Sequence, residues 1–150
     1  MSAPGLREAL ADADVLFDRA ALEDAIARMA GGIVPDYAGD TQPPLFVTIM
    51  HGGLPFAAQL AFALGEQGLD LEFDYLHATR YRGQTSGSGL AWLHRPATSM
   101  RGRRVLLADD ILDEGHTLLA VKRWCEDQGA ADVRIAVLAV KVHDRRVDGI

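Results

Sequence analysis

Apolar runs alternate with segments of helical periodicity along the chain. A nearly continuous apolar run covers residues 45–50. Helices cover both faces of a parallel sheet, so this run predicts a strand that is buried on both sides and central in its sheet. A second apolar run covers 105–108, and a third covers 133–142. We expect both of these to be strands as well.

Two strands of mixed polarity are predicted in the middle of the chain. Apolar and polar residues alternate over 71–76, with Phe73 and Tyr75 among the apolar ones, and predict a strand with one wetter face. Residues 90–93 are predicted to form a brief returning strand. Between these strands, 79–89 hold arginines, serines and three glycines without apolar periodicity, which predicts a mobile loop.

Three segments have the periodicity of helices. Asp18 predicts the start of the first helix because its side chain can cap the free amides, and the glycine pair 31–32 predicts its end at Met29. Pro55 suits the first turn of the second helix. The predicted buried faces are Leu22, Ile26 and Met29; Phe56, Leu60, Ala61 and Leu64; and Leu118, Val121 and Cys125. Residues 34–44 hold three prolines and are interpreted as a connection.

Strands and helices thus alternate about four times along 150 residues. Such alternation is typical of the α/β class, with a mainly parallel central sheet, flanking helices and right-handed crossovers. The chain is 49% hydrophobic and 24% charged, a composition that suits one ordinary globular domain over residues 1–150.

Charge and cysteine content exclude several classes of function. The formal net charge of −6 argues against a nucleic-acid partner, because such proteins generally present a basic surface. Cys125 is the single cysteine, which excludes an internal disulfide framework and fits a reducing, cytoplasmic location. Residues 1–17 lack the apolar core of a signal peptide, and no stretch reaches the roughly 20 apolar residues of a membrane span.

One motif carries candidate chemistry. Asp109 and Asp110 follow an apolar strand, at the end of which open α/β folds hold ligands. The backbone amides of residues 113–117 then precede a helix, whose N-terminus suits a phosphate. Carboxylates repel phosphate, so the two acids suit ribose hydroxyls or Mg²⁺ instead. The motif predicts a phosphorylated ribose, and the alternative is a solvated turn without a ligand.

Residues 105–118 resemble the phosphoribosyl pyrophosphate (PRPP) motif of type I phosphoribosyltransferases. Along nearly its whole length the chain resembles the hypoxanthine-guanine members of that family. The segments that carry this likeness are 15–17 with the helix after them, 50–53, the Arg80–Tyr81 loop, the acidic motif and 139–141. The resemblance implies a type I phosphoribosyltransferase-like fold with a small partial hood. It also implies transfer of phosphoribosyl from PRPP to hypoxanthine or guanine in purine salvage, with Mg²⁺ as cofactor.

The resemblance implies roles for the residues of the acidic motif. Asp109 and Asp110 would bind the ribose hydroxyls and Mg²⁺, the ion mainly through water or those hydroxyls. Asp113 would face N7 of the purine as the acid/base group. The loop that would wrap the 5′-phosphate consists of Asp113, Glu114, Gly115, His116 and Thr117.

The resemblance implies further roles outside the acidic motif. His51, Gly52 and Gly53 would bind pyrophosphate. They belong to the loop 50–53, and the family has an unusual cis peptide before the second position of that loop, which is His51 here. Arg80 and Tyr81 would belong to a lid that keeps water from a reactive sugar cation. In addition, Lys141 would bind the purine by donating to O6, which excludes adenine. Taken without the resemblance, these segments also suit a tight turn, a solvated loop and a strand terminus.

The chain departs from the family pattern at several positions. Glu114 replaces a small hydroxyl residue, His116 stands where Lys is frequent, and Arg80 stands where Ser is common. The sequence stops at Ile150, before the C-terminal hood segment that stacks an aromatic ring on the purine in relatives. We therefore expect either a shortened form of a longer protein or an incomplete purine pocket. The histidines at 77, 94 and 143 lack metal-ligand spacing and are expected to be structural or solvated.

Two alternative functions stay open at this point. The preferred base could be xanthine or another base in place of hypoxanthine or guanine. The chain could also be a regulatory protein that senses PRPP without turnover, which the missing C-terminal segment favours. Relatives in the family are dimers or tetramers, so the resemblance implies a homodimer or homotetramer.

Overall fold

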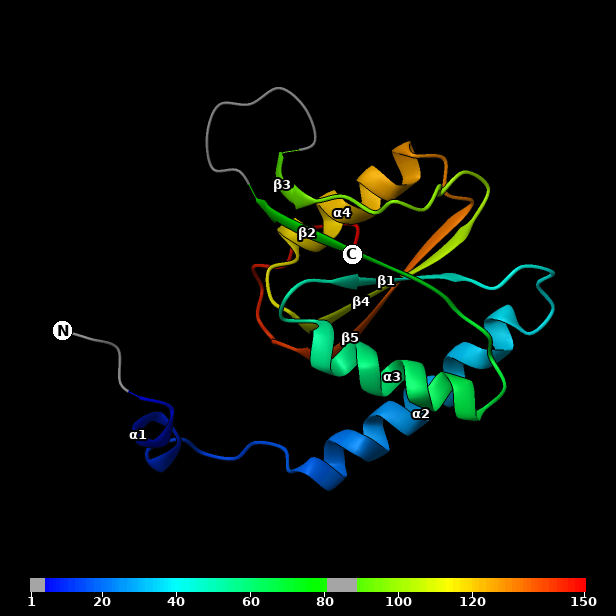
Figure 1. Ribbon diagram of the computed structural model, residues 1–150. Coiled ribbons are helices and arrows are strands. Elements are labelled where there is room, and N and C mark those ends of the chain that lie inside the picture. Colours follow the sequence, from blue (N-terminus) through cyan, green and yellow to red (C-terminus); the bar gives the residue numbers. More distant parts are fainter. Residues whose placement is uncertain (1–4, 81–88) are drawn as a thin grey trace.

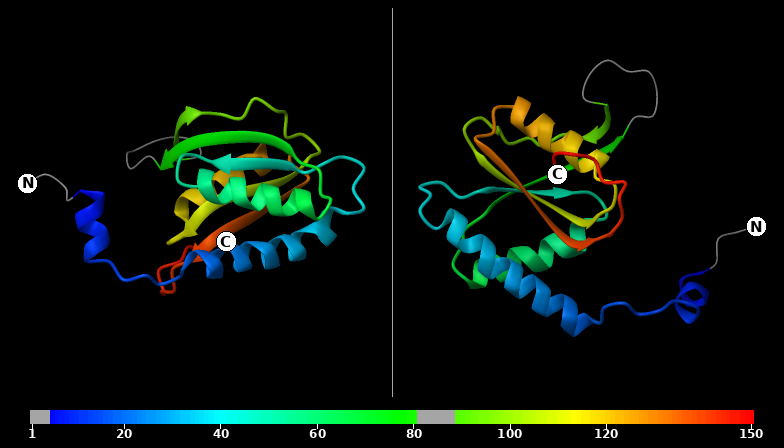
Figure 2. Two further views of the ribbon diagram at one scale, coloured as in Figure 1. Left: turned by 60° about the horizontal axis from the view of Figure 1, so that its bottom comes forward. Right: turned by 180° about the vertical axis from the view of Figure 1, so that it is seen from behind.

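A five-stranded sheet lies between helices in the computed structural model, which describes residues 5–80 and 89–150 (Figure 1). The elements in chain order are α1 (Leu6–Ala11), α2 (Arg19–Tyr37), β1 (Leu45–Ile49), α3 (Leu54–Glu66), β2 (Glu72–Arg80), β3 (Leu90–His94), β4 (Arg104–Leu112), α4 (His116–Asp127) and β5 (Asp132–Val140). Helices α2 and α3 lie on one face of the sheet and α4 on the other, whereas α1 stands apart (Figure 2). The α/β fold with a mainly parallel sheet is confirmed.

The strand order is β3-β2-β1-β4-β5, which confirms that β1 is central. β1 pairs in parallel with both β2 and β4, and β4 pairs in parallel with β5. Only β3 runs antiparallel, beside β2. The carboxyl ends of the four parallel strands therefore meet at one edge, where open α/β folds hold their ligands.

Two hydrophobic clusters hold the helices on the sheet. Val47 and Leu107 point toward α4, where they pack with the buried Val121. Phe46 points to the opposite face and packs with Leu60 of α3. Alternate residues of β1 thus enter different clusters, which explains why its apolar run has no polar gaps. Within 5–80 and 89–150, no helix is both long and apolar enough to cross a membrane.

Helix α2 is longer than its sequence pattern predicts. Its start is confirmed, because the Asp18 side chain accepts a hydrogen bond from the Ala21 amide at 2.8 Å. The predicted end at Met29 is wrong, since the helix continues through both glycines and Pro35 to Tyr37. Each glycine costs about 1 kcal/mol in a helix. Burial of Tyr37 beyond them provides packing that offsets this cost.

Strands β2 and β4 also extend beyond their predicted ends. β4 continues to Leu112 because β5 pairs with it that far, so the two acids lie inside the strand. β2 continues through Arg80, which pairs with Leu90 of β3. The predicted loop over 79–89 therefore begins later, and 81–88 lie outside the described residues.

The burial pattern of β2 differs from its apolar alternation. Leu76 and Ala78 are buried on the face that meets α4. Phe73 and Tyr75 face the other way and are 63% and 43% exposed. The wetter face of this strand is therefore the one that carries the aromatic rings.

Candidate active site

The residues predicted to bind the 5′-phosphate line one cavity at the carboxyl edge of the sheet. Its volume is about 470 Å³. Its walls are Arg80, Asp109, Ile111, Asp113, Glu114, Gly115, His116, Thr117 and Leu118. The structure thus brings the end of β2, the acid Asp109 in β4 and the whole loop before α4 to one place.

The start of α4 presents free amides to this cavity. Gly115 has a φ of +86°, and a Cβ atom there would lie 2.9 Å from Ile150 Cγ2, so the turn requires glycine. The first helical bond runs from the Leu119 amide to the Gly115 carbonyl at 2.8 Å. The amides of residues 116–118 therefore have no acceptor within the helix, and no side chain among residues 5–80 and 89–150 caps it. Free amides at the positive end of a helix suit an anion.

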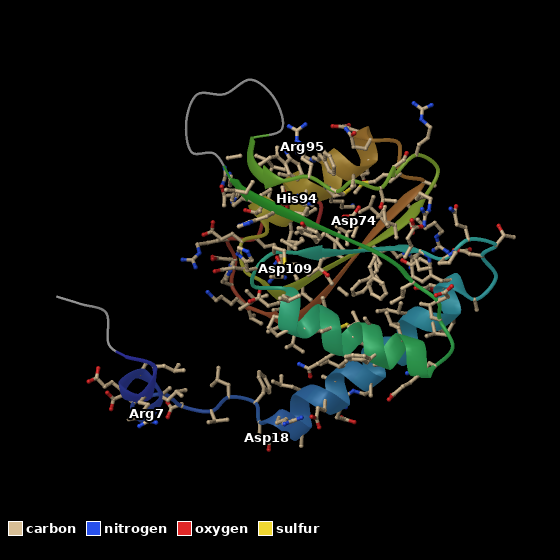
Figure 3. All side chains as sticks on the ribbon, viewed as in Figure 1. Arg7, Asp18, Asp74, His94, Arg95 and Asp109 are labelled. Carbon is tan, nitrogen blue, oxygen red and sulfur yellow. The ribbon has the colours of Figure 1, made fainter. Side chains whose placement is uncertain are left out.

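Asp109 and Asp110 lie just beyond the end of β1, whose pairing with β4 stops at Ala108. Neighbouring residues in a strand point to opposite faces. Asp109 lines the cavity, beside the turn from β1 into α3 (Figure 3). The Asp110 carboxylate lies beside Gly52, where an added Cβ atom would be 3.1 Å from Oδ2. Burial raises the pKa of Asp109 to about 7, and the Asp110 carboxylate adds to this rise.

The loop predicted to bind pyrophosphate packs directly on β4. The Met50–His51 peptide is cis, as in the family pattern. A Cβ atom on Gly53 would lie 2.6 Å from the Ile49 carbonyl oxygen and 2.8 Å from that of Ala108. This close backbone approach requires glycine, and it sets the loop beside the two acids.

Asp113 is held by two donors from the segment that follows β5. Lys141 Nζ donates to Oδ2 at 2.8 Å, and His143 Nε2 lies 2.8 Å from Oδ1. Together, the Lys141 and His143 hydrogen bonds keep the pKa of the Asp113 carboxyl below its usual range. Two residues predicted for one site, Asp113 and Lys141, are thereby brought into direct contact.

Of the two alternatives that the sequence left for His143, structural or solvated, the solvated one is wrong. Its ring is only 14% exposed and contacts the predicted acid/base group. His143 lies 30 residues from Asp113 in the chain, so no local spacing pattern could reveal the pair. The pair forms because residues 141–147 lie along the phosphate loop, with the Lys141 amide on Leu112 O and the Val147 amide on Glu114 O, each at 2.9 Å.

The unusual Glu114 has a cation beside it. Its carboxylate lies 3.6 Å from the Arg145 guanidinium and 3.6 Å from the His116 ring. The Glu114 side chain is half exposed, so its extra negative charge is partly offset and partly solvated. Of the two predicted lid residues, Arg80 lines the cavity, whereas Tyr81 lies outside the described residues.

The sequence is similar to known phosphoribosyltransferases over most of its length. The family model described as phosphoribosyl transferase domain matches residues 12–149. The hypoxanthine-guanine phosphoribosyltransferase of Streptococcus pneumoniae is 31% identical over 135 residues, which cover 89% of this chain and 72% of the relative. The enzyme of that name from Streptococcus thermophilus is 30% identical with the same coverage.

Solved structures agree with this sequence similarity. A hypoxanthine phosphoribosyl transferase structure from Trypanosoma cruzi superimposes with a TM-score of 0.80 at 25% identity, covering 89% of this chain and 72% of that one. A second structure from the same organism, in complex with the product IMP, has a TM-score of 0.76 at 26% identity and covers 84% and 70%. The chain therefore belongs to the phosphoribosyltransferase family, among the hypoxanthine-guanine phosphoribosyltransferases.

Proposed function

We propose that this chain transfers the phosphoribosyl group of PRPP to hypoxanthine or guanine, giving IMP or GMP and pyrophosphate in purine salvage. One observation carries the proposal beyond family membership. The free amides at the start of α4, the partly buried Asp109 and the donor-held Asp113 all line a single cavity. These groups suit a phosphate, a sugar hydroxyl and a purine in turn.

Each part of PRPP has candidate binding groups at this edge of the sheet. The amides of residues 113–117 would hold the 5′-phosphate, and Asp109 with Asp110 would accept hydrogen bonds from the ribose hydroxyls. The pyrophosphate would lie on His51, Gly52 and Gly53, next to the same acids. Arg80 and Tyr81 would belong to the segment that keeps water out during transfer.

The Lys141–Asp113 pair matches one edge of a 6-oxopurine. That edge presents the acceptor O6 beside the N–H at N7. Lys141 can donate to O6, and the Asp113 carboxylate, whose Oδ2 lies 2.8 Å from Lys141 Nζ, can accept from N7. In the reaction, N9 bonds to C1′ as the C1′–O bond to pyrophosphate breaks. Asp113 takes the proton that leaves N7. Adenine has an amine at position 6, which meets the Lys141 donor unfavourably.

The acid pair also suits Mg²⁺, which prefers oxygen ligands and keeps several waters. The described residues contain no group of three or more His, Cys, Asp or Glu that could hold a metal by itself. Asp109 and Asp110 would therefore hold the ion together with ribose hydroxyls and water. A bound Mg²⁺ would neutralise charge on the departing pyrophosphate.

A homodimer or homotetramer is the proposed assembly, and it rests on an uncovered face of the sheet. Phe73 and Tyr75 are exposed on β2, opposite α4. This face continues onto β3, because His94 stacks on Tyr75 with ring centroids 4.0 Å apart, and the neighbouring Leu93 is 67% exposed. Adjacent exposed apolar side chains often mark an interface between subunits. The cytoplasmic location is likewise proposed, from the single free Cys125.

Pyrophosphate release tests the proposed function. The protein is incubated with PRPP, Mg²⁺ and one purine at a time, and release is expected with hypoxanthine or guanine but not with adenine. Release with xanthine alone would assign a different base. PRPP binding without release for any purine would instead indicate a regulatory protein without turnover.

A further inference from the structure

His143 contacts the proposed catalytic carboxylate without being predicted to do so. We infer that His143 is a positioning residue, which holds Asp113 Oδ1 throughout the reaction while Lys141 leaves Oδ2 to bind the purine. The inference rests on the proposed function and adds to it separate roles for the two donors: His143 holds the carboxylate in place, and Lys141 binds the purine. It is carried by the hydrogen bonds on both nitrogens of the ring.

Those two hydrogen bonds determine which ring nitrogen carries the proton. The Arg145 amide donates to His143 Nδ1 at 3.1 Å, so Nδ1 is the acceptor. A neutral imidazole has one acceptor and one N–H, which places the hydrogen on Nε2. Nε2 lies 2.8 Å from Asp113 Oδ1 and therefore donates to it. A backbone amide thus sets the tautomer that Asp113 requires.

The two donors to Asp113 differ in freedom. The His143 ring is 14% exposed and anchored on backbone at its far side, whereas the Lys141 side chain is 56% exposed. The Lys141 backbone is itself fixed, by its amide on Leu112 O and by Arg146 on its carbonyl at 2.6 Å. Lys141 can therefore swing its ammonium to O6 from a fixed base, while the imidazole stays in place.

This arrangement suits the task of a base. Once Lys141 has moved, Oδ2 is free for the proton from N7, and the neutral His143 donor keeps the carboxylate from rotating. The Asp113 side chain is otherwise half exposed and has no other hydrogen-bond partner among the described residues. The remaining charged or titratable groups of the cavity are Arg80, Asp109, Glu114 and His116. A base held within hydrogen-bond reach transfers protons more efficiently than one that must first reorient.

Substitution at His143 tests the inference through kcat and KM. His143→Leu removes the donor and is expected to lower kcat roughly 10-fold, which is less than the roughly 10²- to 10⁴-fold that acid/base catalysis contributes, because Asp113 itself remains. KM for PRPP stays unchanged because the phosphate amides remain. His143→Gln places an N–H at similar reach and is expected to restore most of kcat. Asp144→Ala, in the same exposed segment, is the matched control and keeps full activity.

A cycle with Asp113→Asn separates positioning from general damage. In that background, His143→Leu is expected to change kcat no further, because the group it positions is gone. Equal losses in the Leu and Gln variants, or a KM for PRPP that rises with the fall in kcat, would overturn the inference. An active parent enzyme with unchanged kcat in His143→Leu would overturn the inference alone. A parent enzyme that releases no pyrophosphate with any purine would overturn the proposed function as well.

Discussion

The carboxylate of Asp113 is held by a lysine and a histidine from a distant part of the chain. Asp109, by contrast, is partly buried in the cavity wall beside a second acid, and its pKa is raised to about 7. The two aspartates lie four residues apart, yet their environments push their proton affinities in opposite directions. At the scale of single residues, environment rather than residue type separates the proposed acid/base group from the proposed sugar-binding group.

Asp113→Asn tests the acid/base role. The amide cannot take the proton from N7, so kcat is expected to fall by roughly 10²- to 10⁴-fold. PRPP affinity is expected to persist, because the backbone amides of the loop are unchanged. Stopped-flow or steady-state pyrophosphate release measures kcat, and titration with PRPP provides the control. An unchanged kcat would remove Asp113 from the chemistry.

Lys141→Ala tests recognition of the purine. Loss of a charged donor to O6 costs about 1.5–3 kcal/mol, so GMP is expected to bind roughly 10- to 100-fold more weakly. AMP has no O6 acceptor, and its binding is expected to be insensitive to the substitution. Calorimetric titration with both nucleotides makes the comparison, and equal weakening of the two would argue against a role in selectivity.

Asp109→Asn tests how much free energy of unfolding is lost by partly burying the Asp109 carboxylate. The folded carboxyl has a pKa of about 7 in place of the ordinary 3.8 of an aspartate, so the folded state binds its proton more tightly. Stability is therefore lost as pH rises from about 4 to about 7 and stays reduced above that range. The variant is expected to unfold at a higher temperature than the parent at pH 8, by roughly 2–4 °C per kcal/mol regained, with little difference at pH 4. Thermal scans at both pH values measure this, and a lower unfolding temperature at pH 8 would contradict it.

At the scale of elements, the turns at the carboxyl ends of β1 and β4 carry the site. Gly53 lets the first turn approach the β4 backbone, and Gly115 lets the second enter α4 with a positive φ. Both turns could be predicted from their glycines and from the strands before them. The extension of β4 to Leu112 could not, because Asp109 and Asp110 interrupt its apolar run and the residues beyond Ala108 depend on pairing with β5.

Gly53→Ala tests the close approach of these turns. Its Cβ atom would meet two backbone carbonyl oxygens at 2.6 and 2.8 Å, so the loop must shift away from the acids. We expect a loss of about 1–3 kcal/mol in stability and a raised KM for PRPP. Gly65→Ala in α3 is the control, because nothing lies within 4 Å of the added atom and the helix gains about 0.4–1 kcal/mol. Denaturant unfolding and kinetics compare the two, and identical behaviour would refute the steric argument.

At the scale of the whole molecule, helices cover the sheet unevenly. α2 and α3 cover one face only in part, and leave the aromatic side of β2 and Leu93 of β3 exposed. The apolar alternation of β2 predicted a strand but could not show which of its faces would be covered. Coverage depends on where α3 crosses the sheet, which is a property of the complete fold.

Leu93→Glu tests whether this uncovered face joins subunits. A buried charge at an interface is costly, so the variant is expected to shift the proposed dimer or tetramer toward monomer. Leu10→Glu on α1, which stands apart from the sheet, is the matched control for an exposed leucine. Light scattering after gel filtration measures the mass, and an assembly that survives Leu93→Glu would exclude this face.

The sequence by itself determined that the five strands exist, where α2, α3 and α4 begin, and the family, because these depend on short-range periodicity, capping and local motifs. Only the tertiary structure decided which groups meet. His143 reaches Asp113 across 30 residues because β5 pairs with β4 and the segment after β5 binds the phosphate loop. α2 continues through Gly31 and Gly32 because Tyr37, further along the helix, is buried. Contacts of this kind depend on strand register and packing, which no local pattern of residues encodes.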